Sequence, residues 1–99
     1  MQMEARALIA PGNLGLDTRV EFRRAAVEAL NDIPEGAGPL VIELAGTRTV
    51  DSAGLGVLML IQRHAAERRV AVVLRNANDE LRFLLALTKL MDLFQLESA

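Results

Sequence analysis

The stretch TVDSAGLGVLMLIQ, residues 49–62, places an acid, a hydroxyl and two glycines directly before an apolar run. Asp51 and Ser52 are residue types preferred at helix starts, because their side-chain oxygens accept hydrogen bonds from free backbone N–H groups. The apolar residues that follow recur at helical spacing and predict a helix over residues 52–67. Their stripe is wide, which is typical of a helix packed against a sheet.

The segments on either side of this helix alternate between strand patterns and helix patterns. Short apolar runs bounded by Gly or Pro predict strands at 5–10, 40–45 and 70–74, and a short last strand within 93–98. Helical spacing predicts two more helices, at 18–32 and from 78 to 87 or 88. Thr18 and Glu21 have the spacing of a capping box, and Asn78 suits a helix N-cap. The segments GNLGLD (12–17) and GTRTVD (46–51) are expected to be loops.

This order of elements predicts the fold class. Strands that alternate with helices imply right-handed crossovers and a largely parallel sheet. We therefore expect an α/β fold with a mostly parallel or mixed four-stranded sheet and three main helices packed largely on one face. The length of 99 residues allows one core, so residues 1–99 are expected to form a single domain.

Composition excludes several kinds of site. The chain has no cysteine and a single histidine, so we expect no disulfide, no metal site built on cysteines or several histidines, and no cofactor. A formal net charge of −2 provides no basic field for direct nucleic-acid binding. No apolar run reaches the length that spans a bilayer, and the first residues lack a signal-peptide pattern. We therefore expect a cytoplasmic location without membrane insertion.

Two interpretations of Ser52 follow from the residues alone. It can simply begin the helix, or it can be a serine that another protein modifies. Gly54 and Gly56 each cost about 1 kcal/mol against alanine in a helix, so they are expected where backbone approaches a neighbouring strand, a partner or a phosphate. The free N–H groups of a helix start can stabilise a phosphate, which would add about −1.5 to −2 charges beside Asp51.

An enzyme is not expected. Hydrolysis by a serine nucleophile needs a base. The only histidine, His64, lies more than three turns after Ser52 along the same helix, about 18 Å away. The sequence therefore indicates no catalytic residue.

The central and C-terminal parts of the chain resemble the STAS domain family (sulfate transporter and anti-sigma factor antagonist). In bacterial anti-sigma factor antagonists a phosphorylated serine follows an aspartate in a D-S-[ST]-G-L-G segment. The matching residues here are Asp51, Ser52, Ala53, Gly54, Leu55 and Gly56. The segment LRFLLALTKLMDLF (81–94) resembles the family's third helix and its end, and GNLGLDTR (12–19) loosely resembles a loop beside the family's partner surface.

The resemblance implies a function. Such antagonists bind an anti-sigma factor that is also a serine kinase with a histidine-kinase-like ATPase fold, and so free a sigma factor and regulate transcription. Phosphorylation of the serine breaks the complex. Carried over, Ser52 is the phosphoacceptor, residues 51–56 are the partner-binding segment, and Asp17 and Thr18 border it. Ala53 stands where a second hydroxyl is common in the family.

A second STAS type is a rival interpretation. A stand-alone STAS subunit with a D-T-A-G-L segment binds the ATPase of a lipid-transport ABC system that maintains outer-membrane asymmetry. The DSAGL segment of this chain (51–55), with alanine third, resembles that version. In both interpretations the protein is a binding module.

Overall fold

A parallel sheet and two covering helices form the centre of the molecule. The computed structural model describes residues 6–98. The strands β1 (Arg6–Ile9), β3 (Leu40–Glu43), β5 (Val72–Arg75) and β6 (Gln95–Glu97) lie in the order β1-β3-β5-β6, and each neighbouring pair is parallel. The predicted α/β class is therefore confirmed, and the described sheet is parallel throughout.

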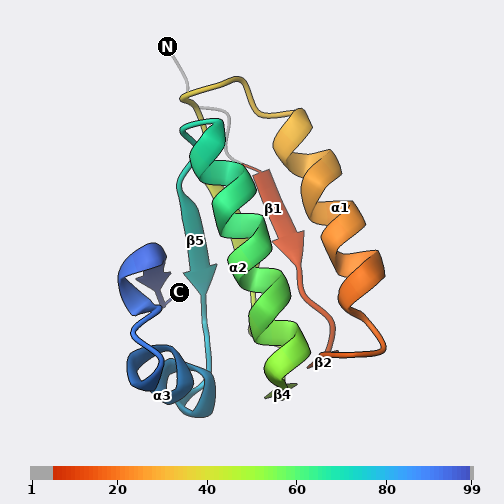
Figure 1. The fold of residues 1–99 in the computed structure, drawn as a ribbon, viewed down its shortest axis with the longest axis vertical. Helices are drawn as coiled ribbons and strands as arrows, with labels where there is room; N and C mark the ends of the chain where they lie inside the picture. The colour runs from red at the N-terminus through yellow and green to blue at the C-terminus, as the bar shows by residue number, and fades with distance from the viewer. Residues whose placement is uncertain (1–5, 99) are drawn as a thin grey trace.

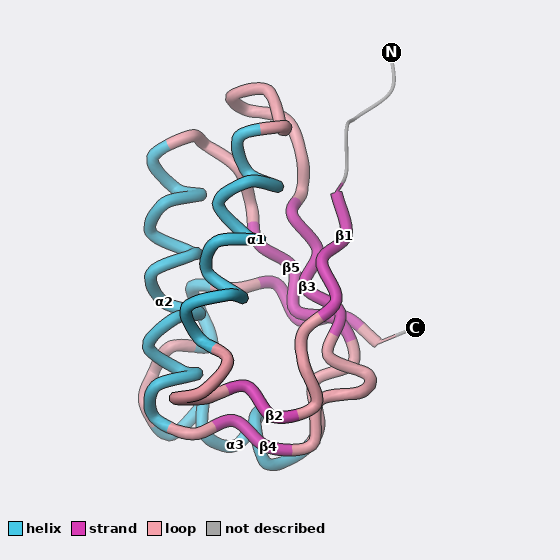
Figure 2. The backbone as a smooth tube through the Cα atoms, turned by 90° about the vertical axis from the view of Figure 1, so that its right-hand side faces the viewer, coloured by secondary structure: helices cyan, strands magenta, loops and turns pink. Residues whose placement is uncertain are grey.

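The helices lie mainly on one face of this sheet. Helices α1 (Arg19–Asn31) and α2 (Ser52–Glu67) run side by side across it, while α3 (Asp79–Leu87) lies beyond the lower end of β5 in Figure 1. Figure 2 shows the two layers edge-on, with α1 and α2 on one side of the strands. A 3-10 turn, η1 (Met91–Leu93), connects α3 to β6. Among the described residues no helix is long and apolar enough to span a membrane.

The core forms between the two layers. One register row across the sheet consists of Leu8, Ile42, Leu74 and Leu96, which all belong to the core or pack against it. Leu58 of α2 is fully buried in the same cluster. Burial of such aliphatic side chains contributes roughly 25 cal/mol for each Å² removed from water, so this contact holds the helices on the sheet.

Two short strands were not expected. Residues Asn13–Leu14 (β2) and Thr49–Val50 (β4) pair in parallel, so the prediction of plain loops at 12–17 and 46–51 is wrong at these positions. The Thr49 hydroxyl also donates a hydrogen bond to the Asn13 side-chain oxygen. Strands of two residues are too short to show a periodic pattern, and they form only because the fold brings them together.

The predicted capping box is also wrong. Thr18 precedes α1, but its side chain makes no cap hydrogen bond, and Glu21 pairs with Arg24 instead. The Thr18 hydroxyl donates to the backbone oxygen of Asn13 at 2.8 Å and accepts from Gly15 N at 3.0 Å. The hydroxyl therefore orders the preceding loop rather than the first turn of the helix.

Most other predicted elements agree with the structure to within two residues. Helix α2 has the predicted bounds, and Asn78 caps α3 by accepting from Leu81 N at 2.8 Å. Strand β1 is shorter than the predicted 5–10, of which residue 5 lies outside the described residues. Strand β5 begins at residue 72 rather than 70, because Arg69 has a positive φ of 58° and Val70 N still bonds back to Ala65 O.

Two leucines of α2 test the layer packing. Leu58 is 0% exposed and Leu60 is 46% exposed. We expect Leu58→Ala to lower the free energy of unfolding by about 2–5 kcal/mol, because it leaves a cavity in the core. Leu60→Ala on the outer side should cost under about 1 kcal/mol. Urea denaturation of both variants checks this, and equal losses would contradict the packing described.

Candidate functional site

The candidate site lies at the beginning of α2. Figure 1 shows this end of α2 beside β2 and β4. It lies below β1 and β5, whose arrows point toward this end of the molecule. Binding sites of open α/β sheets commonly lie outside the carboxyl ends of the strands. Ser52 is the first residue of α2 and its side chain is exposed. A hydroxyl at this position is open to a modifying enzyme.

The Asp51 carboxylate joins two segments of the site. One of its oxygens accepts a hydrogen bond from Gly54 N at 2.9 Å and so caps α2, as its residue type predicts. The other oxygen accepts from Leu16 N at 3.2 Å, and the backbone N–H of Asp51 donates to Leu14 O. Asp51 therefore fastens the 13–18 loop to the start of the helix.

These hydrogen bonds also change the acidity of the group. The bond from Gly54 N is the largest cause that lowers the pKa of Asp51, and the bonds from Leu16 N and Ala53 N lower it further. Partial burial acts in the opposite direction but does not outweigh them. The carboxylate therefore stays ionised at neutral pH, and a negative charge lies next to Ser52.

Two glycines allow the loop and the helix to touch. A Cβ on Gly54 would lie 2.1 Å from Leu14 O, and a Cβ on Gly15 would lie 2.3 Å from an Asp51 carboxylate oxygen. Both distances are shorter than any non-bonded contact, so side chains at these positions would push the two segments apart. Gly54 is therefore explained by a close contact inside the chain.

Gly56 has a different environment. Apart from its chain neighbours and the backbone of its own helix, no atom lies within 4 Å of the position that its Cβ would occupy. The packing inside the chain therefore does not require a glycine there. The bare backbone of this turn stays half-exposed on the outer side of α2.

The neighbouring loops are anchored to the same platform. Asp17 is exposed, and Thr18 follows it at the start of α1. On the other side, the buried Thr47 donates from its hydroxyl to Pro11 O at 2.8 Å, and the Asn78 amide donates to Arg48 O at 3.1 Å. The N-cap of α3 thus also fixes the loop that leads to Ser52.

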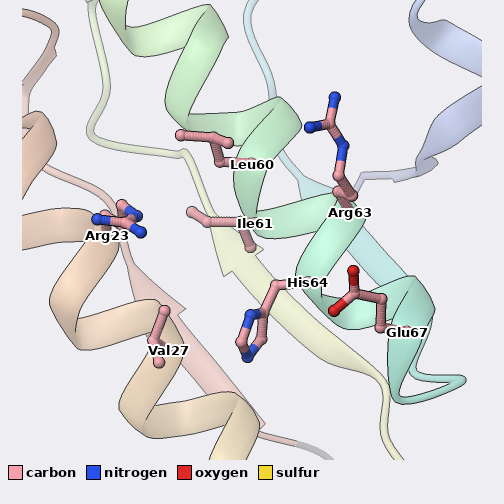
Figure 3. A pocket seen from close by; sticks show the side chains of 7 residues that line it. All are labelled: Arg23, Val27, Leu60, Ile61, Arg63, His64 and Glu67. Atoms are coloured by element: carbon pink, nitrogen blue, oxygen red, sulfur yellow. The ribbon is translucent and has the colours of Figure 1, made fainter.

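The structure brings the predicted site residues together. The 51–56 segment and the loop that contains Asp17 and Thr18 lie against each other through Asp51. His64 does not join them, because it lies in the last turn of α2 and its side chain points toward α1 (Figure 3). Within residues 6–98 no group of three acidic, histidine or cysteine side chains could hold a metal ion.

Sequence reasoning missed three residues of this platform. The backbone oxygen of Leu14 accepts a hydrogen bond from Asp51 N and lies against Gly54. Gly15 has no side chain to collide with the Asp51 carboxylate, and Leu16 N donates a hydrogen bond to it. Leu16 is also 65% exposed beside the site. The two glycines of the GNLGLD segment were the available signal, but Asp51, which bonds to this loop, lies 35 residues after Leu16 in the chain.

Comparison with known proteins identifies the family. A family model described as "Mlab, STAS domain" matches residues 1–96. The chain is a STAS domain. No curated protein sequence matches this STAS domain.

Two solved structures share the fold. A proposed anti-sigma factor antagonist from Thermotoga maritima matches with a TM-score of 0.79 at 19% identity, covering 99% of this chain and 84% of its own. A sulfate transporter family protein from Wolinella succinogenes matches with a TM-score of 0.75 at 14% identity, covering 94% of this chain and 75% of its own. At these identities the likeness shows the fold alone.

The two glycines of α2 give a matched test of the platform. We expect Gly54→Ala to lower the free energy of unfolding by about 1–3 kcal/mol, because the methyl group collides with Leu14 O. Gly56→Ala should raise it by about 0.5–1 kcal/mol, because alanine favours the helix and meets no neighbour. Guanidinium denaturation measures both, and the same sign for the two variants would contradict the close contact.

The lowered pKa of Asp51 predicts a pH dependence. Because the folded-state pKa lies below the unfolded value, the carboxylate stabilises the fold above about pH 4, and this contribution is lost as the pH falls through the folded-state pKa. We expect Asp51→Asn to be less stable than wild type at pH 7, with a gap that narrows in acid. Chemical denaturation between pH 7 and pH 2 checks this. Asp17→Asn is the control for removal of a nearby charge, and a gap for Asp51→Asn that widens in acid would refute the prediction.

Proposed function

We propose that this STAS domain is an anti-sigma factor antagonist that switches partners through Ser52. The observation that carries the proposal is an exposed serine at the first position of α2, within the D-S-A-G-L-G segment. In its unphosphorylated form the protein binds an anti-sigma factor with a histidine-kinase-like ATPase fold. The anti-sigma factor then releases its sigma factor, and transcription changes.

Phosphorylation supplies the switch. The partner kinase transfers the γ-phosphoryl group of ATP to Ser52 Oγ, the hydroxyl proton passes to a base or to water, and ADP leaves. The product carries about −1.5 to −2 charges beside the ionised Asp51. A partner surface that fits the neutral hydroxyl then meets like-charge repulsion and a desolvation cost, so the complex dissociates without a change of fold.

The platform supports a switch that depends on local electrostatics. Asp51, Gly54 and Leu16 are fixed by hydrogen bonds and close contacts, so Ser52 is presented on a rigid base. The partner-binding surface in this proposal consists of residues 51–56 with Asp17 and Thr18. STAS domains are regulatory binding modules, which supports a protein that is the kinase's substrate rather than an enzyme. The proposed location is the cytoplasm, where the kinase and ATP are present.

A second function is favoured by two observations. The matching family model carries the description "Mlab, STAS domain", and alanine occupies the third place of the DSAGL segment. In this alternative the chain is an accessory subunit that binds the ATPase of a lipid-transport ABC system. Ser52 would then be a docking residue without a phosphorylation cycle.

Affinity capture from an extract of the native cells tests both functions. Wild type, Ser52→Ala and Ser52→Asp serve as baits, and mass spectrometry identifies the captured proteins. We expect a histidine-kinase-like ATPase with wild type and Ser52→Ala. With the purified ATPase, Ser52→Asp should raise the Kd at least about tenfold, because its negative charge imitates part of the phosphate effect.

Two results would count against the switch. The first is a Kd for Ser52→Asp equal to that of wild type. The second is failure of the purified kinase and ATP to add one phosphate to wild type, measured by intact mass with Ser52→Ala as the control. Capture of a transporter ATPase in place of the kinase would support the lipid-transport alternative.

A further inference from the structure

A groove runs between α1 and α2 on the side away from the sheet. Two adjoining hollows of about 160 and 270 Å³ form it, and they share Arg23 of α1 and Leu60 of α2. The groove begins at Ala53, next to Ser52, and ends at Glu67. It therefore continues the proposed partner surface along almost the whole length of α2.

The floor of the groove is apolar. Val20 and Leu60 line it with exposed fractions of 71% and 46%, which are high for aliphatic side chains. Figure 3 shows Leu60 and Ile61 extending from α2 toward α1, which carries Val27. Gly56 has no side chain, so none projects from this position into the groove near the Ser52 end. Such a surface gains free energy when an apolar partner face covers it.

The rim of the groove is basic although the whole chain is acidic. Arg19, Arg23 and Arg63 line the two hollows, against one carboxylate, Glu67. Within residues 6–98 no carboxylate lies within ion-pairing distance of these three arginines.

Four other arginines of the described chain, Arg6, Arg24, Arg69 and Arg75, form ion pairs. Arg24 lies between Glu21 and Glu28, and Arg75 lies between Glu43 and Glu97. Arg48, Arg68 and Arg82 also form no ion pair within residues 6–98 but line neither hollow, whereas Arg19, Arg23 and Arg63 lie together along one groove. They are complementary to a negatively charged partner.

We propose that the α1–α2 groove binds an acidic amphipathic helix of the partner. Its apolar stripe covers the floor between the helices, and its Glu or Asp side chains pair with the arginines of the rim. A groove between two helices suits a helix better than a flat membrane surface, because the partner's side chains enter the hollow. This inference rests on the proposed function for its location beside Ser52.

The same geometry connects the groove with the switch. Arg19 and Ala53 line the end of the groove nearest to Ser52. A phosphate on Ser52 places negative charge at that end, where it repels acidic side chains of the bound helix and competes for the arginine. Phosphorylation therefore weakens the binding of an acidic helix in particular.

Two synthetic peptides test the groove without the unknown partner. One is an amphipathic helix of about four turns with leucines on one face and glutamates on the other, and the second carries lysine in place of each glutamate. Titration into ¹⁵N-labelled protein should shift the amide signals of Val20, Arg23, Gly56 and Leu60 with the glutamate peptide. The lysine peptide should bind at least about tenfold more weakly, because the arginines repel it.

Variants give the matched control. The double variant Arg19→Glu and Arg23→Glu should lose at least about tenfold in affinity for the glutamate peptide and gain affinity for the lysine peptide. Arg82→Glu removes an arginine of α3 that lines neither hollow and should leave both affinities unchanged. Circular dichroism verifies that each variant is folded.

Several outcomes would overturn the proposal. They are absence of binding by the glutamate peptide, equal binding of the two peptides, shifts outside the groove, and binding to phosphatidylglycerol vesicles without binding to the peptide.

The two proposals can fail separately. If the peptide binds but Ser52→Asp leaves ATPase binding unchanged, the groove stands and the switch is wrong. If Ser52→Asp abolishes ATPase binding but the peptide fails, the groove is wrong.

Discussion

The Asp51 carboxylate is the interaction on which the candidate site depends. It accepts hydrogen bonds from Leu16 N in one loop and from Gly54 N in the first turn of α2. Without it, the loop and the segment that leads into the helix would keep the Asp51 N–Leu14 O bond, the short β2–β4 pairing and the Thr49–Asn13 hydrogen bond. The acid therefore has a structural role as well as an electrostatic one, and it holds Ser52 in place while contributing charge beside it.

The sheet supports this platform from behind. Its four parallel strands place the following loops at one end of the molecule, and core packing by residues such as Ile42, Leu58 and Leu74 fixes α2 against it. The same fold occurs in proteins that share under a fifth of their residues with this chain. Function therefore resides in the surface that the fold presents, and we propose that this surface is the exposed Ser52 and the groove that begins beside it.

The groove and the serine form one continuous surface with two kinds of chemistry. The Ser52 end presents a hydroxyl beside a carboxylate, and the groove presents aliphatic side chains bordered by arginines. The net charge of −2 gives no indication of this basic strip, because it sums the charges of the whole chain and does not show where they lie. Local charge distribution, rather than total charge, determines which partner such a surface attracts.

Local propensity and periodicity were enough to predict the α/β alternation, the bounds of α2, the Asn78 cap and the position of Ser52 at a helix start. The β2–β4 pairing, the role of Thr18, and the partners of Asp51 and Gly54 became visible in the folded molecule. The same holds for the groove, whose arginines come from two helices. Apart from the local bonds of Thr18 and the helix cap of Asp51, these features join residues distant in the chain, and their free energy appears only when packing brings them into contact.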